Sequence, residues 1–372
     1  MNIAIDSRPY FEKQKDGISG YFTNLLDNIV KIDHSNDYTL FVNEDCANNF
    51  DSRKIDLKIL KNPKMCWPQT RLTYHFLTNK DKFDLFFAPA HSIPFYTGCK
   101  KVAVIHDLAY KKFREYFTNF DYIMLSKLTT NFAIKYSDHL IADSISTKND
   151  IIEFYDVKPE KISVIYLGYD KNKFYRRSSE EIEKTKIRYK INNDYIIFVG
   201  TLQKRKNVER LIRAYDLLVK KGRKEKLVIV GKKGWLYDDI FNAVSELRLK
   251  DNVIFTDYVP ENDLSALISG AKCFVLPSLY EGFGLPLLEA MACGTPVVTS
   301  NVSSLPEICS DAGILINNPY SIEEIAERIL GLIDDDLLRS NLSSKGLERA
   351  RLFSWEKCAK QTLEVLTRVN EQ

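Results

Sequence analysis

The stretch PSLYEGFGLPLLEAMACGTPVV, residues 277–298, decides how the rest of the chain is interpreted. The four apolar residues before it, CFVL at 273–276, indicate a buried strand. Pro286 suits the first turn of a following helix because its fixed φ is already helical. That helix is apolar on every side except at Glu289, and Gly294 ends it. We therefore expect a strand, a turn and a buried helix that carries one carboxylate.

Two carboxylates frame this predicted turn. Glu289 would cost several kcal/mol if its charge were buried without a partner, so it needs one. Glu281 precedes Gly282, Phe283 and Gly284, where bare glycine backbone lets a ligand approach closely. Carboxylates accept hydrogen bonds from hydroxyls and amides donate to them, so one interpretation is a polyhydroxylated ligand. The other is that Glu289 faces the helix macrodipole and Glu281 is a solvated loop charge.

Glu281 and Glu289, with seven residues between them, resemble the E-x7-E motif of retaining nucleotide-sugar glycosyltransferases, family 4 of the sequence classification. The resemblance implies the GT-B fold, which is α/β with two Rossmann-like doubly wound parallel-sheet domains facing across a cleft. It also implies that Glu281 grips the donor sugar together with the amides around Gly282–Gly284 and Leu285. Glu289 would hold the ribose hydroxyls.

The length of 372 residues exceeds what a single core supports, so two domains are expected. Apolar runs alternate with amphipathic segments, which is the βα pattern of a parallel doubly wound sheet. We place the domains at 1–170 and 171–353, and the resemblance implies that a final helix within 354–372 crosses back to the first domain. Ligands bind beyond the carboxyl ends of such strands, so site residues are expected in the loops there.

A basic turn, GTLQKRKN, follows the first apolar strand of the second domain and ends at Asn207, the expected N-cap of the next helix. Three cations before a helix N-terminus suit a diphosphate because fixed charge and macrodipole act together, although a solvated basic turn is the alternative. In the family an arginine commonly follows the glycine; here Thr201 follows Gly200. The anion contact is therefore assigned to Arg205 and Lys206.

Two further turns are candidate ligand contacts. Tyr258 lies in the turn after the apolar run at 253–255, and the resemblance implies that this turn flanks the nucleotide base. Gly17 opens the segment GISGY, a predicted turn before a helix, which resembles the family's G-x-G-R-Y element with Ser19 and Gly20 substituted. Such a turn can receive a phosphate or let an acceptor approach, or it is a turn only.

His106 follows the predicted strand 101–105 and resembles the H-D element of the family, in which the histidine reaches the 6-hydroxyl region of the donor sugar. The alternative is a structural histidine. A basic cluster lies nearby, and it fits either a solvated face or attraction to an anionic membrane or a phosphate-bearing acceptor. Its members are Lys100, Lys101, Lys111, Lys112 and Arg114.

Composition excludes several classes of protein. A net charge of +3 gives no nucleic-acid footprint. The seven scattered cysteines form no C-x-x-C pair and indicate free thiols in a reducing compartment. The chain opens on a strand and contains no long apolar run, so we expect a cytoplasmic protein that touches the inner membrane at most peripherally. The acidic run 334–336 is interpreted as a solvated turn, and no metal or other cofactor is expected.

The predicted activity is metal-independent, retaining transfer of a hexose from a nucleotide sugar to a saccharide or lipid-linked saccharide acceptor. His106, Glu281, Arg205 and Lys206 are the candidate catalytic residues, and front-side attack assisted by the leaving phosphate is the route that the resemblance implies. The motifs most resemble bacterial polysaccharide and lipopolysaccharide mannosyltransferases that use GDP-mannose. A UDP-sugar transferase, a nucleotide-sugar epimerase and a non-catalytic nucleotide-sugar-binding protein remain alternatives, and a dehydrogenase is disfavoured because G-x-G-x-x-G is absent.

Overall fold

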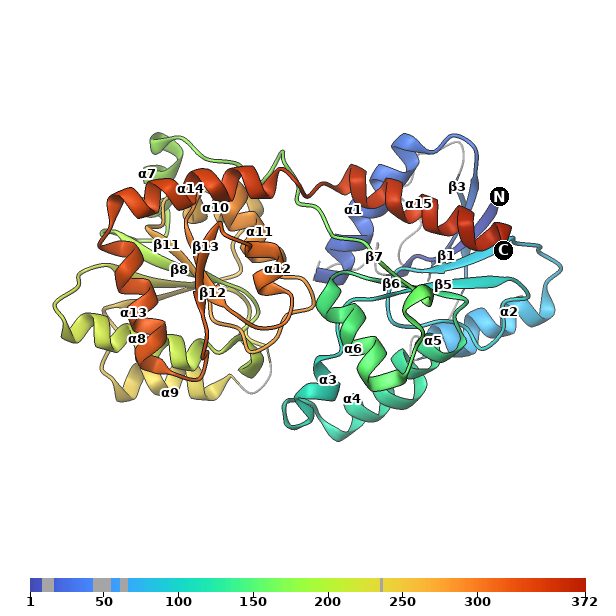
Figure 1. The fold of residues 1–372 in the computed structure, drawn as a ribbon, viewed down its shortest axis with the longest axis horizontal. Helices are drawn as coiled ribbons and strands as arrows, with labels where there is room; N and C mark the ends of the chain where they lie inside the picture. Colours follow the sequence, from blue (N-terminus) through green and yellow to red (C-terminus); the bar gives the residue numbers. More distant parts are fainter. Residues whose placement is uncertain (9–16, 43–54, 61–65, 235–236) are drawn as a thin grey trace. The chain divides into compact units, whose positions relative to one another are not determined.

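The computed structural model describes residues 1–8, 17–42, 55–60, 66–234 and 237–372. The chain forms two compact units, each built on its own sheet (Figure 1). The first unit consists of Met1–Gly168 together with Ser354–Gln372, and the second consists of Tyr169–Phe353. The α/β class with two Rossmann-like parallel-sheet domains, predicted from the sequence, is confirmed.

The first unit contains a seven-stranded sheet in the order β3-β2-β1-β4-β5-β6-β7, and its strand pairings are parallel. Its strands are β1 (Asn2–Asp6), β2 (Asp37–Val42), β3 (Ile55–Ile59), β4 (Leu85–Ala88), β5 (Lys100–Ile105), β6 (His139–Ala142) and β7 (Ile162–Val164). Its α-helices are α1 (Gly17–Ile32), α2 (Thr73–Thr78), α3 (Ala109–Lys112), α4 (Asn119–Ile123), α5 (Thr130–Tyr136), α6 (Ile145–Tyr155) and α15 (Trp355–Glu371).

The second unit contains a six-stranded parallel sheet in the order β10-β9-β8-β11-β12-β13. Its strands are β8 (Tyr195–Val199), β9 (Lys226–Val230), β10 (Val253–Asp257), β11 (Cys273–Leu276), β12 (Val297–Ser300) and β13 (Gly313–Ile316). Its α-helices are α7 (Ser179–Arg188), α8 (Val208–Lys220), α9 (Asp238–Glu246), α10 (Glu261–Ser269), α11 (Leu285–Ala292), α12 (Leu305–Cys309), α13 (Ile322–Ile333) and α14 (Asp336–Ala350).

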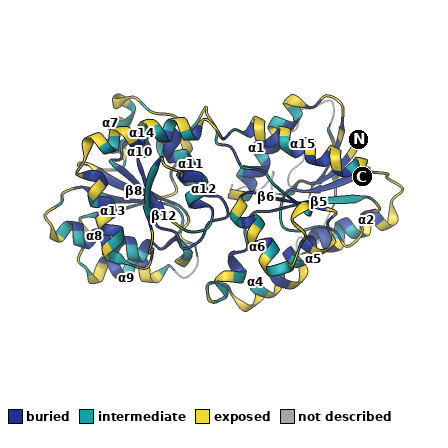
Figure 2. Ribbon diagram, in the orientation of Figure 1, coloured by how far each residue is buried: buried dark blue, intermediate teal, exposed yellow. Residues whose placement is uncertain are grey.

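Burial explains why the strands are continuous apolar runs rather than alternating ones. Helices cover both faces of each sheet, so β8 and β11 are buried at every residue (Figure 2). The amphipathic helix α8 buries one stripe, as its sequence predicts; the stripe includes Leu211, Ile212, Tyr215 and Leu218. Burial of the apolar sheet faces against the apolar stripes of the helices therefore determines the layered architecture.

The strand order creates one switch point in each sheet, where neighbouring strands lead to helices on opposite faces. It lies between β1 and β4 in the first unit and between β8 and β11 in the second. The loops that follow these paired strands start side by side, and this is where doubly wound proteins bind ligands. The basic turn after β8 and the glutamate turn after β11 therefore meet at one place.

Local structure departs from the sequence-based predictions at three points. Gly17 does not lie in a turn before a helix, because α1 already begins at this residue. Asn207 precedes α8 as predicted but does not cap it: its φ is +61°, and its side-chain amide donates to Pro277 O and Pro319 O at 3.0 and 2.6 Å. The strand predicted over 162–166 ends at Val164.

Candidate active site

The centre of the site is a buried ion-pair cluster at the switch point of the second unit. Lys206 Nζ lies 2.6 Å from Glu281 Oε1, and Arg205 Nη1 lies 3.0 Å from Glu281 Oε2. Ser278 Oγ donates to the same Oε1 at 2.7 Å. The cations come from the turn after β8 and the carboxylate from the turn after β11, so pairing of these two strands brings the groups together.

The charges of this cluster hold Glu281 ionised although the residue is only 5% exposed. Burial alone would raise the pKa of the Glu281 carboxyl, but the charges of Lys206 and Arg205 outweigh it and lower this pKa to about 2. Two cations contact one carboxylate here, at the carboxyl ends of two neighbouring strands. Fixed cations at this edge of a doubly wound sheet suit an anionic ligand.

The turn that carries Glu281 is held in place by hydrogen bonds from a distant loop. Ser303 Oγ accepts from Glu281 N at 2.9 Å. Ser304 Oγ lies within 3.0 Å of Glu281 O and 2.8 Å of Phe283 O, and it can donate to either carbonyl. The Glu281 amide is thus used inside the protein, and it is not one of the amides at 282–284 that the resemblance assigned to the sugar. The serines lie more than twenty residues away, and no local signal in the sequence indicated them.

The helix α11 begins as the sequence predicts, with Pro286 in its first turn and Gly284 directly before it. Gly284 has φ +100°, a conformation that costs other residues strain, and a Cβ there would lie 3.0 Å from the Leu305 side chain. The positive φ therefore favours glycine here, and a side chain would in addition need a small shift of Leu305. Leu285, the first helical residue, is half-buried.

Glu289 lies on α11 and is half-buried. Its carboxyl makes no hydrogen bond or ion pair with any residue in the part of the chain that the structure describes. Burial, followed by the charge of Glu261, raises the pKa of this carboxyl to about 8, although Lys173 opposes the shift. The partner that the sequence required is thus not supplied by the described residues, which leaves the carboxyl available to a ligand.

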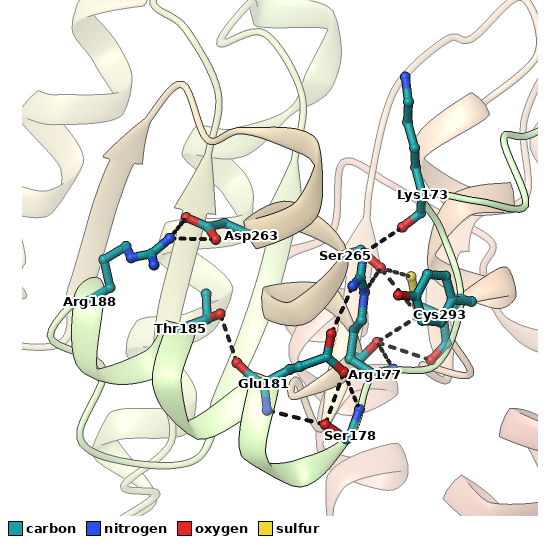
Figure 3. A network of polar contacts seen from close by, with 11 residues as sticks. Lys173, Arg177, Ser178, Glu181, Thr185, Arg188, Asp263, Ser265 and Cys293 are labelled. Atoms are coloured by element: carbon teal, nitrogen blue, oxygen red, sulfur yellow. Dashed lines mark hydrogen bonds and ion pairs between the residues drawn. The ribbon is translucent and has the colours of Figure 1, made fainter.

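A polar network connects the C-terminal end of α11 to α10 and to the N-terminal part of α7 (Figure 3). Ser265 and Ser269 of α10 contact Cys293 through its Sγ and its carbonyl oxygen, both at 3.5 Å. Arg177 donates from Nε to Ser265 Oγ at 3.2 Å and from Nη1 to Glu181 at 2.9 Å (Figure 3). The network joins α7, α10 and α11, and so it limits how far the helix that carries Glu289 can move.

The remaining predicted donor contacts lie at the carboxyl ends of β8 and β10. Gly200 follows β8, and Gly231 after β9 approaches it so closely that a Cβ at 231 would lie 2.0 Å from Gly200 O. Thr201 is exposed, and Tyr258 after β10 is 66% exposed. Gly231 therefore shapes this edge of the sheet. The sequence analysis did not assign Gly231 to the site.

His106 lies in the first unit, directly after β5, as predicted. Its Nδ1 is 2.6 Å from Asp143 Oδ2 and its Nε2 is 2.9 Å from Pro89 O. Both ring nitrogens are engaged inside the protein, whereas the resemblance implied a ring that reaches a sugar hydroxyl. Sequence reasoning missed Asp143, although it follows β6, the strand next to β5.

The basic residues near His106 do not form one cluster. Lys100 Nζ donates to Val369 O of α15 at 2.9 Å, and Lys112 Nζ lies 2.5 Å from Asp150. Arg114 Nη1 donates to Phe117 O at 2.8 Å. These three side chains serve separate local contacts, and both interpretations of the basic residues, a solvated face and attraction to an anionic surface, stay predictions. None of the helices in the described ranges combines the length and apolar character that crossing a bilayer requires.

The acidic run 334–336 is exposed, as predicted for a solvated turn. Asp335 caps α14, because its side chain accepts from Leu338 N at 2.8 Å. Asp334 pairs with Arg223 at 2.7 Å. Asp336 pairs with Arg339, so all three carboxylates have structural contacts.

Comparison with known proteins agrees with this geometry. Residues 179–349 match the family described as "Glycosyl transferases group 1", and residues 33–173 match "Glycosyltransferase Family 4". O-antigen chain mannosyltransferase B of Escherichia coli is 33% identical over 266 residues, which are 71% of this chain and 69% of that protein. The serotype-specific mannosyltransferase WbdA of Escherichia coli is 30% identical over 288 residues, and the match covers 76% of this chain but 34% of WbdA.

Solved structures share the fold. HepE from Anabaena in complex with UDP-glucose superposes with a TM-score of 0.78 at 19% identity, covering 99% of this chain and 100% of that one. WaaG, a glycosyltransferase involved in lipopolysaccharide biosynthesis, gives a TM-score of 0.76 at 18% identity, with 98% and 99% covered. Fold and site together define a glycosyltransferase of the GT-B class. The chain belongs to the glycosyltransferase group 1 family, with an N-terminal region of family 4.

Proposed function

We propose that this glycosyltransferase moves mannose from GDP-mannose to a saccharide or lipid-linked saccharide acceptor during cell-surface polysaccharide biosynthesis, with retention of anomeric configuration and without a metal. The second unit would hold the nucleotide sugar and the first unit the acceptor. The observation that carries the proposal is the cluster of Arg205, Lys206 and Glu281 at the switch point, followed by α11 with Glu289.

The charge of this cluster supports stabilisation of the leaving group. Glycosyl transfer passes through an oxocarbenium-like state while a nucleoside diphosphate departs with growing negative charge. Arg205 and Lys206 are two preorganised cations that could neutralise that charge without a divalent ion, and Lys206 is only 7% exposed, so its field is weakly screened by solvent. A diphosphate that approached them would share these cations with Glu281.

The two glutamates would divide the rest of the donor between them. Glu281 stays ionised through its cation partners and can accept hydrogen bonds from sugar hydroxyls. Glu289 has a carboxyl without a partner among the described residues, which fits the ribose hydroxyls. No pair of carboxylates is proposed as nucleophile and base, and His106 has no free ring nitrogen to accept a proton. Front-side attack assisted by the leaving phosphate is therefore the proposed route.

The identity of the donor is tested by the nucleotide that the protein binds. A thermal-shift panel of GDP, UDP, ADP and CDP should give its largest shift with GDP. A ligand at about 100 times its dissociation constant stabilises the folded protein by about 2.7 kcal/mol. The relatives named as mannosyltransferases support mannose as the transferred sugar. A larger shift with UDP would favour the UDP-sugar alternative, and product analysis with the donor alone would detect an epimerase.

Peripheral contact with the inner membrane is also proposed, at the surface formed by α4 and the π-helix Met124–Leu128 that follows it. Phe120, Ile123 and Leu128 are 62%, 48% and 40% exposed there, and Lys127 is exposed beside them. Apolar side chains next to a cation suit an anionic bilayer surface. Flotation with vesicles that contain anionic lipid, but not with neutral ones, should carry the protein upward, and F120A/I123A should reduce this. Equal flotation of the parent and the variant would contradict the contact.

A further inference from the structure

His106 and Asp143 form a buried pair at the edge of the first sheet. They follow β5 and β6, which are parallel neighbours with Ile105 opposite Ala142, so the two side chains start from adjacent positions. His106 is 9% exposed and Asp143 is 2% exposed. The backbone of His106 is also held, since Thr147 Oγ1 donates to its carbonyl oxygen at 3.3 Å. Position and orientation of the imidazole are thus determined by the strands and their loops.

The hydrogen bonds of this ring define its protonation state. Pro89 O can only accept, so the Nε2 atom at 2.9 Å must carry a proton. The Asp143 carboxylate at 2.6 Å accepts a hydrogen bond from Nδ1, which then also carries a proton. A carboxyl is ordinarily a stronger acid than an imidazolium by more than two pKa units, so the shared proton resides on the ring. Two acceptors on two nitrogens make this histidine a cation.

The groups around the His106 ring leave the imidazolium as the positive charge at this place, because the neighbouring titratable rings stay neutral. Burial lowers the pKa of His106, but the charge and hydrogen bond of Asp143 outweigh it and raise this pKa, with a smaller contribution from Asp107. His91 packs edge-on at a ring-centroid distance of 5.2 Å; burial and the His106 charge lower its pKa to about 4, so it stays neutral. The buried Tyr21 ring also packs edge-on against His106, at a ring-centroid distance of 4.8 Å.

Tyr21 is neutral as well, because burial raises the pKa of its hydroxyl, with additional contributions from Cys358 and Asp143. The Cys358 thiol on α15 also has a raised pKa, caused by burial and then by Asp143. Among the groups that face the ring in the described structure, the carboxylates of Asp143 and Asp107 are therefore the charged ones. Asp143 is the one that contacts it.

We propose that Asp143 is a positioning residue of the glycosyl-transfer reaction, which holds His106 as a fixed imidazolium that donates both ring protons. Because both ring protons are donated to Asp143 and Pro89, His106 is a fixed imidazolium and does not act as a general base. The proposal rests on the proposed transferase activity for its functional part, but the charge state of the ring can be measured without any substrate.

The experiment uses Asp143→Asn in the full chain. Asparagine keeps the size of the side chain and an acceptor oxygen for Nδ1, but it removes the negative charge. Ring ¹⁵N and ¹H NMR of the parent should show His106 doubly protonated at pH 7, and the same signature in D143N should appear only at lower pH. Transfer by D143N should fall roughly tenfold in kcat/KM at pH 8 and less at pH 6, as expected when a protonated group is lost.

Two controls keep the result interpretable. His139 contacts Ser163 and has a pKa lowered to about 4 by burial and then by nearby cations, so its titration should not change. Asp150→Asn removes another buried carboxylate of the same unit, which pairs with Lys112 rather than His106, and should leave the pH profile of transfer unshifted.

A neutral His106 in the parent at pH 7, or identical His106 titration in parent and D143N, would overturn the proposal whether or not D143N folds well. Absence of transfer with any donor, while the parent ring is an imidazolium and D143N lowers its pKa, would instead refute the proposed function.

Discussion

Both units place a buried ion pair at the carboxyl ends of neighbouring strands, yet the two pairs differ in their balance of charge. In the second unit two cations, Arg205 and Lys206, contact the one carboxylate of Glu281. In the first unit His106 and Asp143 oppose each other one to one. An unbalanced pair can exchange part of its coordination for an anionic ligand, whereas a balanced one has no electrostatic reason to open. The comparison assigns ligand binding to the first kind and positioning to the second.

The largest effect should come from removing a cation of the unbalanced pair. Lys206→Ala leaves Glu281 buried with one partner fewer, and breaking a buried pair costs about 3–5 kcal/mol of stability. Turnover should fall on the order of 10²-fold and nucleoside-diphosphate affinity should fall with it, as for a lost preorganised donor. Arg205→Ala should act in the same direction. Calorimetry, kinetics and urea unfolding measure the three quantities.

Lys204→Ala is the matched control, because Lys204 belongs to the same basic turn but is exposed and pairs with Asp239 at 3.3 Å. It should leave diphosphate binding unchanged. If Lys206→Ala binds the diphosphate as tightly as this control does, the turn is only a solvated basic turn.

The two glutamates should separate in their effects, which sharpens the comparison within the second unit. Glu281→Gln removes the counter-charge of the cations, so diphosphate affinity should be kept, while transfer should fall sharply, about 10²-fold, because a contact that strengthens in the transition state is lost. Glu289→Gln should weaken diphosphate binding several-fold through the ribose. Equal losses of affinity in both variants would show that the division of roles is wrong.

The pH dependence of stability provides a smaller effect with a defined sign. The folded-state pKa of Glu289 is about 8 against an ordinary 4.5, so the folded protein holds this proton more tightly. The free energy of unfolding should therefore decrease as pH rises from about 4.5 to about 8, and Glu289→Gln should flatten this slope. Urea unfolding at about pH 5 and pH 8 measures it. Glu281 contributes in the opposite sense, since its pKa of about 2 adds stability above pH 4.5 that is lost as pH falls toward 2.

The smallest expected effect is that of a chelator. If Arg205 and Lys206 neutralise the leaving diphosphate, excess EDTA should leave the rate of transfer unchanged, and added magnesium or manganese should not raise it. Loss of turnover in EDTA with recovery on adding a divalent ion would contradict metal-independent transfer. Arg205 and Lys206 would then bind the diphosphate without being sufficient to neutralise its charge as it leaves.

The sequence by itself determined the elements and the residue types of the site. Strands buried on both faces must be continuous apolar runs, so the apolar runs at 195–199 and 273–276 predict these strands. Pro286 marks the first turn of α11 because its constraint on φ is local to the residue. The sequence also places a basic turn and a glutamate turn directly after strands of one predicted parallel sheet, but their pairing depends on the strand order, in which β8 and β11 are neighbours.

Only the tertiary structure decided which partners these residues have. Ser303 and Ser304 hold the Glu281 turn, Asp143 holds His106, and Asn207 bridges two proline carbonyls instead of capping a helix. Each contact joins residues more than twenty positions apart, because strand order and loop packing bring them together. Propensity and periodicity act over a few residues, so they predict where a side chain starts but not which atom it meets.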